Sequence, residues 1–173
     1  MLFQGQYWFY GTHADKVKRL TAEFDGKHKL FQYNHEVYQL APVVGFLYRR
    51  RAEQNRESGS DTSIFPEQIS NYKDVFLFNY QLIMLLDENH ESDENARLDK
   101  AFRFFGTDKS LPDEELYEAY VRGGVDVLYE KLIEPATSPE DYVKNLYEFM
   151  DDFESRYGQN ADEIYDLCRI ARS

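Results

Sequence analysis

The chain has 173 residues and a formal net charge of −12, and this length is sufficient to build one hydrophobic core. Its 14 Tyr and 13 Phe exclude a mainly disordered chain, because disordered segments contain few aromatic residues. The single cysteine, Cys168, excludes an intramolecular disulfide and predicts a reducing, cytoplasmic location. We expect one helical domain over residues 1–173, without a signal peptide and without membrane association.

The charge is divided unevenly along the sequence. Residues 1–56 contain nine Lys and Arg against five Asp and Glu, a net charge of +4, whereas residues 57–173 carry −16. This pattern is typical of a protein with solvated acidic helix faces. It is also the pattern of a molecule that presents opposite charges to different partners.

An aromatic segment at residues 1–11 is the first predicted element. Residues 6–10 favour a strand by propensity, but the sequence contains no clear second strand. We therefore expect an unpaired, extended segment that Trp8 anchors to the helices. A short amphipathic helix follows, from Thr12 to the turn at Gly26.

The next predicted helix begins at Asn34, is kinked or restarted near Pro42, and ends in a run of arginines. The arginines of this run are Arg49, Arg50, Arg51 and Arg56. One interpretation is a solvated helix end in which Arg49 pairs with Glu53. The alternative is a docking site for nucleic-acid phosphates or for a partner protein.

The most apolar stretch of the chain lies at residues 75–86, after a predicted flexible loop at residues 57–63 and a short helix that Pro66 opens. This stretch is too short to cross a bilayer, which requires about 20 apolar residues. A helix that is apolar on every side belongs in the centre of a domain. We therefore predict an all-α, non-repeat fold of about seven or eight helices around a buried central helix at residues 75–86.

The rest of the chain is predicted to form amphipathic helices. Asp99 and Arg103 have the spacing of an ion pair along one helix. Pro112 opens the next helix, Ser138 precedes another with a regular apolar stripe, and a last helix is expected after Asn160.

Gly123 and Gly124 fall within the helix that follows Pro112, where two glycines cost roughly 2 kcal/mol relative to alanine. A close approach of two helices, or a joint between them, would offset this cost. Alternatively, free backbone N–H groups beside Arg122 could bind phosphate or carboxylate. The stretch lacks the lysine and the spacing of a phosphate-binding loop.

The sequence contains no catalytic or metal-binding motif, so we predict no catalytic residue and no cofactor. Tyr and Arg are enriched at protein interfaces, and the chain is rich in both. We therefore predict a non-catalytic adaptor that acts through protein–protein interaction, as a small subunit or regulator of a larger assembly. The alternatives are a nucleic-acid accessory protein that uses the basic first third, an acidic DNA mimic, and an anion-binding domain or enzyme at Arg122-Gly123-Gly124. A homo-oligomer is compatible with each of these.

Overall fold

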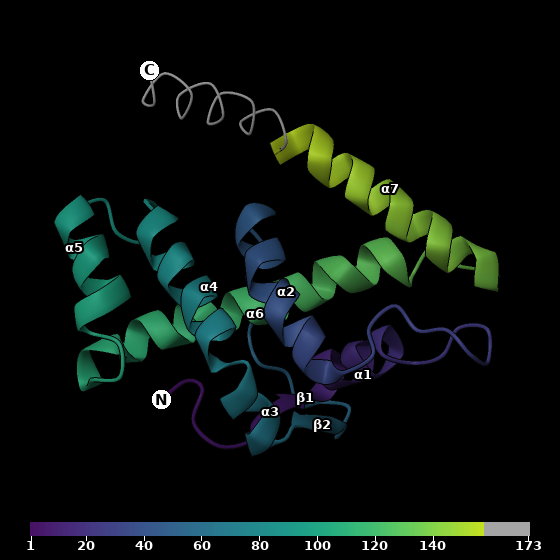
Figure 1. Ribbon diagram of the computed structural model, residues 1–173, viewed down its shortest axis with the longest axis horizontal. Helices are drawn as coiled ribbons and strands as arrows, with labels where there is room; N and C mark the ends of the chain where they lie inside the picture. The colour runs from purple at the N-terminus through teal and green to yellow at the C-terminus, as the bar shows by residue number, and fades with distance from the viewer. Residues whose placement is uncertain (158–173) are drawn as a thin grey trace. The chain divides into compact units, whose positions relative to one another are not determined.

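The computed structural model describes residues 1–157, most of which are helical (Figure 1). The described elements are β1 (Tyr7–Tyr10), α1 (Gly11–Leu20), α2 (Asn34–Leu47), β2 (Asp61–Ile64), α3 (Pro66–Asn71), α4 (Lys73–Leu86), α5 (Glu94–Leu98), a π-helical turn (Asp99–Arg103), a 3-10 turn (Asp108–Ser110), α6 (Leu111–Leu132) and α7 (Pro139–Tyr157). The predicted helical fold class is confirmed, with a small sheet in addition. The helix expected after Asn160 and Cys168 lie outside the described residues. None of the described helices is both long enough and apolar enough to span a bilayer.

The backbone groups into two compact units, a first one of residues 1–129 and a second one that begins at Glu130. The boundary falls inside α6. The single domain expected over residues 1–173 therefore stays a prediction. The first unit contains the sheet and helices α1 to α5, together with most of α6.

The sheet corrects two predictions. β1 pairs antiparallel with β2, so that Tyr7 lies opposite Ile64 and the N-terminal segment is not unpaired. β2 occupies part of the predicted flexible loop at residues 57–63, and its polar sequence gave no sign of a strand. The Asn34 side chain donates to the Ser63 carbonyl oxygen over 2.9 Å and thereby holds β2 against the start of α2. Tertiary contacts, rather than strand propensity, account for this pairing.

The side chain that anchors β1 is Phe9 and not Trp8. Phe9 is 2% exposed, whereas Trp8 keeps 39% of its surface exposed. Successive side chains of a strand point to opposite faces, so only one of two neighbours can enter the core. The expectation that Trp8 anchors the segment is therefore wrong.

α4 carries the apolar run, but only one of its faces is buried. Phe76, Tyr80 and Ile83 are buried, whereas Phe78 is 61% and Leu86 55% exposed. The prediction that this helix is buried on every side is therefore wrong, although its helical state and position are confirmed.

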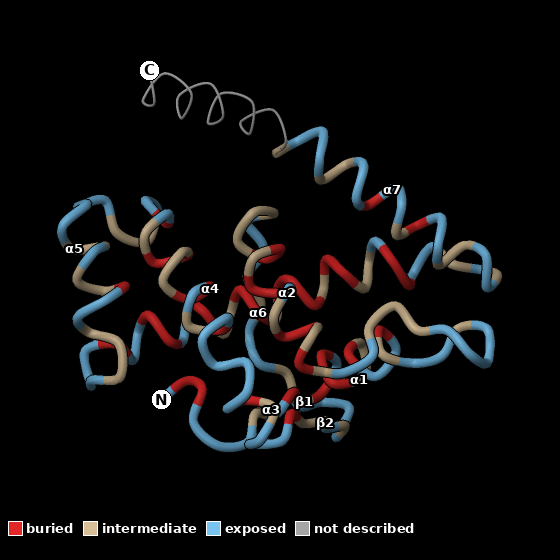
Figure 2. Tube along the Cα trace, viewed as in Figure 1, coloured by how far each residue is buried: buried red, intermediate tan, exposed pale blue. Residues whose placement is uncertain are grey.

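The most enclosed helix of the first unit is α6, which α2 and α4 cross (Figures 1 and 2). Tyr117, Val121, Val125 and Leu128 are completely buried along its length. The sequence of α6 did not indicate this burial, because the helix contains carboxylates that are buried as well, including Asp113 at 1% exposure. The Asp113 Oδ1 atom lies 2.6 Å from His90 Nε2 and accepts a hydrogen bond from Lys100 Nζ over 2.8 Å. Buried charges with such partners are compatible with a core position.

Gly45 and Gly124 allow α2 and α6 to cross in direct backbone contact, whereas Gly123 faces the backbone of Arg50, beyond the end of α2. α6 runs without interruption through Gly123 and Gly124. A Cβ atom added to Gly124 would overlap the carbonyl oxygen of Ala41 and would lie 2.8 Å from its Cα atom. A Cβ atom on Gly45 would likewise overlap the carbonyl oxygen of Tyr120. The interpretation as a close helix–helix approach is confirmed for Gly124.

In the second unit, α7 begins where the sequence predicted a helix after Ser138. The Asp141 carboxylate accepts hydrogen bonds from the backbone N–H groups of Thr137 and Ser138, over 2.9 and 2.8 Å. These bonds, the one from Thr137 foremost, lower the pKa of Asp141 to about 2. They satisfy donors that have no partner within the helix.

Candidate functional site

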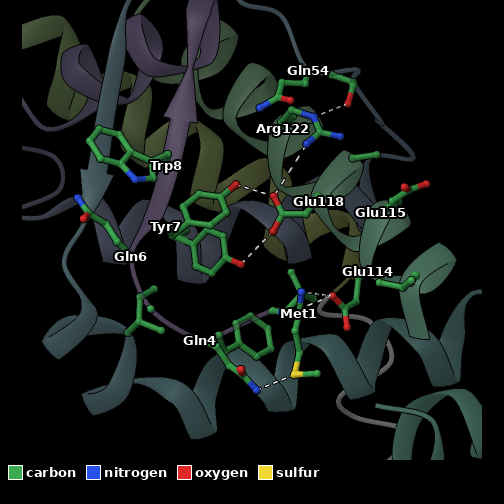
Figure 3. Close-up of a pocket in the computed structure, with 18 of the residues that line it drawn as sticks. Met1, Gln4, Gln6, Tyr7, Trp8, Gln54, Glu114, Glu115, Glu118 and Arg122 are labelled. Carbon is green, nitrogen blue, oxygen red and sulfur yellow. Dashed lines mark hydrogen bonds and ion pairs between the residues drawn. The ribbon is translucent and has the colours of Figure 1, made fainter. Parts of the chain in front are cut away.

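A cavity of about 860 Å³ opens in the first unit, between the N-terminal segment, residues 51–54 and the first half of α6 (Figure 3). We call it the Glu118 cavity after the carboxylate at its centre. Its volume is in the range of sites that bind small molecules or a few residues of a peptide.

α6 supplies the acidic wall of the cavity. Glu118 follows Glu114 by four residues and Glu115 by three and precedes Arg122 by four, so these side chains share a face of the helix. Glu115 is exposed, whereas Glu114 is 6% exposed.

Residues 51–54, which are neither helix nor strand, form a second wall that two hydrogen bonds hold to α6. The Ala52 N–H donates to the Ala119 carbonyl oxygen over 3.0 Å. Arg122 Nε donates to the Ala52 carbonyl oxygen over 2.8 Å. The Arg122 side chain therefore holds this stretch in place.

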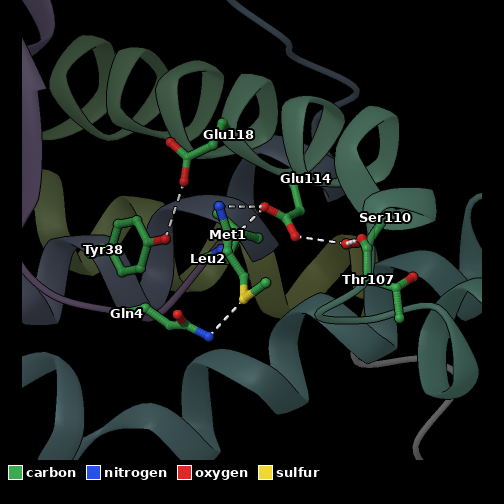
Figure 4. Close-up of polar contacts among 8 residues, drawn as sticks. All are labelled: Met1, Leu2, Gln4, Tyr38, Thr107, Ser110, Glu114 and Glu118. Atoms are coloured by element: carbon green, nitrogen blue, oxygen red, sulfur yellow. Dashed lines mark hydrogen bonds and ion pairs between the residues drawn. The ribbon is translucent and has the colours of Figure 1, made fainter.

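The Glu118 carboxylate receives hydrogen bonds from two distant parts of the chain (Figures 3 and 4). The Tyr7 hydroxyl of β1 donates to Oε2 over 2.6 Å, and the Tyr38 hydroxyl of α2 donates to Oε1 over 3.2 Å. Arg122 Nη1 lies 3.9 Å from Oε2, beyond hydrogen-bonding distance. The carboxylate is thus held by two neutral donors, with a cation farther away.

Burial determines the ionisation of this cluster. It raises the pKa of Glu118, and the hydrogen bond from Tyr7, the Arg122 charge and the hydrogen bond from Tyr38 oppose this rise without cancelling it. Burial, followed by the Glu118 charge, also raises the pKa of Tyr7 and of Tyr38 well above the ordinary value. Both phenols consequently stay protonated and remain donors.

Glu114 holds the N-terminal segment at the edge of the cavity (Figure 4). Its carboxylate accepts hydrogen bonds from the Leu2 N–H over 3.1 Å and from the Ser110 hydroxyl over 2.7 Å. The amino group of Met1 lies 3.2 Å from Glu114 Oε2. An amine therefore already binds one carboxylate at this edge.

The cavity lining is acidic overall. It contains four glutamates, at positions 53, 114, 115 and 118, against two arginines, Arg51 and Arg122. An anionic ligand would meet net repulsion here, whereas a cationic group would be attracted. Trp8, at the rim, adds an aromatic surface that is partly exposed.

The structure removes the premise of the predicted anion site at Arg122-Gly123-Gly124. No helix begins there, because both glycines lie in the interior of α6, where backbone N–H groups bond within the helix. Arg122 does line the cavity, but its guanidinium is already bonded to Ala52 and lies beside Glu118. A site for phosphate at this position has no support from the described residues.

The arginine run is not helical, contrary to the prediction. α2 ends at Leu47, and Arg49 adopts a left-handed conformation with a φ of 53°. Arg51 lies over the Tyr120 ring at 5.8 Å, and Arg56 lies over the Tyr10 ring at 4.2 Å. These are cation–π contacts within the chain. Docking of nucleic acid or of a partner at Arg49, Arg50, Arg51 and Arg56 stays a prediction.

Sequence reasoning missed the three residues at the centre of the cavity: Tyr7, Tyr38 and Glu118. One signal was present, because Glu118 and Arg122 have the i, i+4 spacing of a helical ion pair. In the sequence, Tyr7 belongs to an aromatic run, and Tyr38 belongs to the apolar face of a predicted helix. Nothing in the sequence indicated that they meet one carboxylate.

No group of three or more His, Cys, Asp or Glu side chains among residues 1–157 has an arrangement that could hold a metal ion. Comparison with protein-family models, with curated proteins and with solved structures finds no match for this chain. The chemistry of the Glu118 cavity is therefore the basis for assigning a function.

Proposed function

We propose that this protein acts without catalysis, by binding an extended segment of a partner protein in the Glu118 cavity. It would serve as an adaptor, or as a small subunit or regulator of a larger assembly. The observation that carries the proposal is a cavity of peptide-binding size, one wall of which is a chain segment outside any helix or strand. The single cysteine of the chain supports a reducing, cytoplasmic setting.

The wall at residues 51–54 can pair with a peptide backbone. Within the described part of the chain, the backbone N–H groups of Glu53 and Gln54 make no hydrogen bond, and both residues are exposed. Extended peptides commonly bind by adding their backbone hydrogen bonds to such a segment. Side chains of the peptide would then alternate between the cavity and solvent.

The rim has the composition of a protein-binding surface. Trp8 and Leu111 are 39% and 52% exposed, and Arg51 lies on the same rim. Trp and Arg are enriched among the residues that dominate binding energy in protein complexes. Partly exposed apolar side chains around a cavity are typical of an interaction site.

Selection from a random library of displayed peptides tests the proposal, with selected sequences then made synthetically. Trp8 is the only tryptophan of the chain, so its fluorescence reports directly on occupation of the rim. We expect saturable binding that Gln54→Pro weakens about tenfold, since proline removes one backbone donor. Gln54→Ala keeps this donor and is the matched control, with circular dichroism as the check of folding. The proposal fails if no selected peptide binds saturably, or if both variants bind as the wild type does.

A further inference from the structure

We infer that the group recognised inside the Glu118 cavity is an organic cation, an ammonium or guanidinium that binds the Glu118 carboxylate. The inference deepens the proposed function and uses the same cavity. Two sources share this chemistry: a lysine or arginine side chain of a bound peptide, and a free alkylamine.

The Glu118 carboxylate has acceptor capacity left. A carboxylate offers about four lone-pair positions, and the Tyr7 and Tyr38 hydroxyls occupy one on each oxygen. The side chain lines the cavity and retains 18% exposure, so a ligand can reach it. Arg122 does not fill the remaining positions, because its Nη1 atom is 3.9 Å away and its Nε–H is bonded to Ala52.

Among the described residues, the cation that pairs with Glu118 is Arg122, and at 3.9 Å this ion pair includes no hydrogen bond. Burying a carboxylate is costly unless it is paired, and two neutral phenols compensate only in part. The raised pKa of Glu118 is consistent with this deficit. An ammonium or guanidinium at hydrogen-bonding distance would remove the deficit and would form a charge-assisted bond.

The remaining features of the cavity fit a cation on an apolar stem. Glu53 and Glu115 lie exposed in the lining and would attract a positive charge toward the opening. The aromatic rings of Tyr7 and Trp8 can contact the alkyl stem or the charge itself.

Three small probes of similar size test the inference: n-butylammonium, the neutral n-butanol and the anionic butyrate. They are titrated at constant ionic strength, with Trp8 fluorescence and saturation-transfer NMR as independent readouts. We expect saturable binding of n-butylammonium alone. Saturable binding of n-butanol or butyrate with comparable affinity would overturn the inference.

Glu118→Gln should weaken n-butylammonium binding roughly tenfold to a hundredfold, because a charged hydrogen-bond acceptor is lost. Glu134→Gln removes the same charge at an exposed position outside the cavity and should leave binding unchanged. Equal affinity of Glu118→Gln and the wild type would overturn the inference.

The wild-type protein provides a second measurement that needs no variant. Protonation of Glu118 should weaken binding as the pH falls from neutrality through the raised pKa of this carboxylate. The titratable and charged groups that influence Glu118 are Tyr7, Tyr38, Tyr117, Arg122 and Glu114, and neither the tyrosines nor the arginine titrate in this acidic range. Binding that is as tight at the lower pH would contradict the inference.

A further binding experiment with peptides distinguishes a peptide side chain from a free alkylamine as the source of the cation, and it distinguishes failure of the inference from failure of the proposed function. The peptide Ac-Ala-Lys-Ala-NH₂ is compared with its isostere that carries norleucine in place of lysine. If selected peptides bind but norleucine replaces their basic residues without loss, the inference fails and the proposed function stands. If n-butylammonium binds and no peptide does, the cavity accepts a free amine, and the proposed function fails instead.

Discussion

Replacing Gly124 with alanine should destabilise the protein, although alanine is the better helix former. In an isolated helix this substitution stabilises by about 1 kcal/mol. Here the added methyl group would overlap the Ala41 carbonyl oxygen of α2. That atom belongs to the backbone and cannot rotate away, so that α2 and α6 must separate.

The magnitude follows from the two opposing effects. Overpacking of a core costs about 1–3 kcal/mol, and a clash with backbone lies at the upper end or above it. After subtraction of the gain in helix propensity, we expect a net loss of about 2 kcal/mol. For a chain of this size, each kcal/mol shifts the Tm by about 2–4 °C, so the Tm should fall by about 4–8 °C.

Thermal and urea unfolding, followed by circular dichroism on the full chain, measure this loss. Lys131→Ala, at an exposed position of the same helix, is the matched control and should change stability by no more than about 0.5 kcal/mol. A Gly124→Ala variant that is as stable as the wild type, or more stable, would refute the close crossing, because propensity alone would then account for the result.

Three further substitutions test the buried polar contacts. Burial raises the folded-state pKa of Glu118 above its ordinary value, so its contribution to stability falls as the pH rises from the ordinary pKa through the raised one. The stability of Glu118→Gln relative to the wild type should therefore increase with pH across this window and then level off; a Tm difference that does not vary with pH would contradict this. Tyr7→Phe removes the 2.6 Å hydrogen bond to Glu118 and should cost about 1–3 kcal/mol in urea unfolding, whereas Tyr147→Phe, at a 76% exposed position, should be neutral. Asp113→Asn removes the carboxylate charge that His90 and Lys100 contact and should lower the free energy of unfolding by about 2 kcal/mol. The control is Asp99→Asn, which removes an ion pair with the exposed Arg103 and should lower it by less than about 0.5 kcal/mol. Equal losses of stability in the two variants would argue against the buried cluster.

Local patterns in the sequence predicted the helices well because helical periodicity depends on neighbouring residues alone. The Asp99–Arg103 pair, at 2.6 Å, is one such local feature. β2 could not be predicted, since its strand state depends on pairing with β1, more than fifty residues away. The central position of α6 could not be predicted either, because an aspartate such as Asp113 is expected at the surface unless its buried partners are known.

The candidate site was predictable only where its residues are neighbours. Glu118 and Arg122 are one helical turn apart, and their proximity can be read from the sequence. The other contacts to Glu118 join residues separated by 111 and 80 positions, from Tyr7 and Tyr38. Such contacts depend on how β1, α2 and α6 assemble, which no single segment specifies.

The glycine crossing also restricts how this sequence can diverge. Apolar residues in a core can exchange for others of similar volume, so they leave a weak trace in distant homologues. Gly45 and the Gly123-Gly124 pair have no such substitutes, because even a methyl group collides with backbone, that of the facing helix for Gly45 and Gly124 and that of Arg50 for Gly123. A glycine inside one helix and a glycine pair inside a later, longer helix therefore form a pattern by which remote members of this lineage can be found after other similarity has been lost.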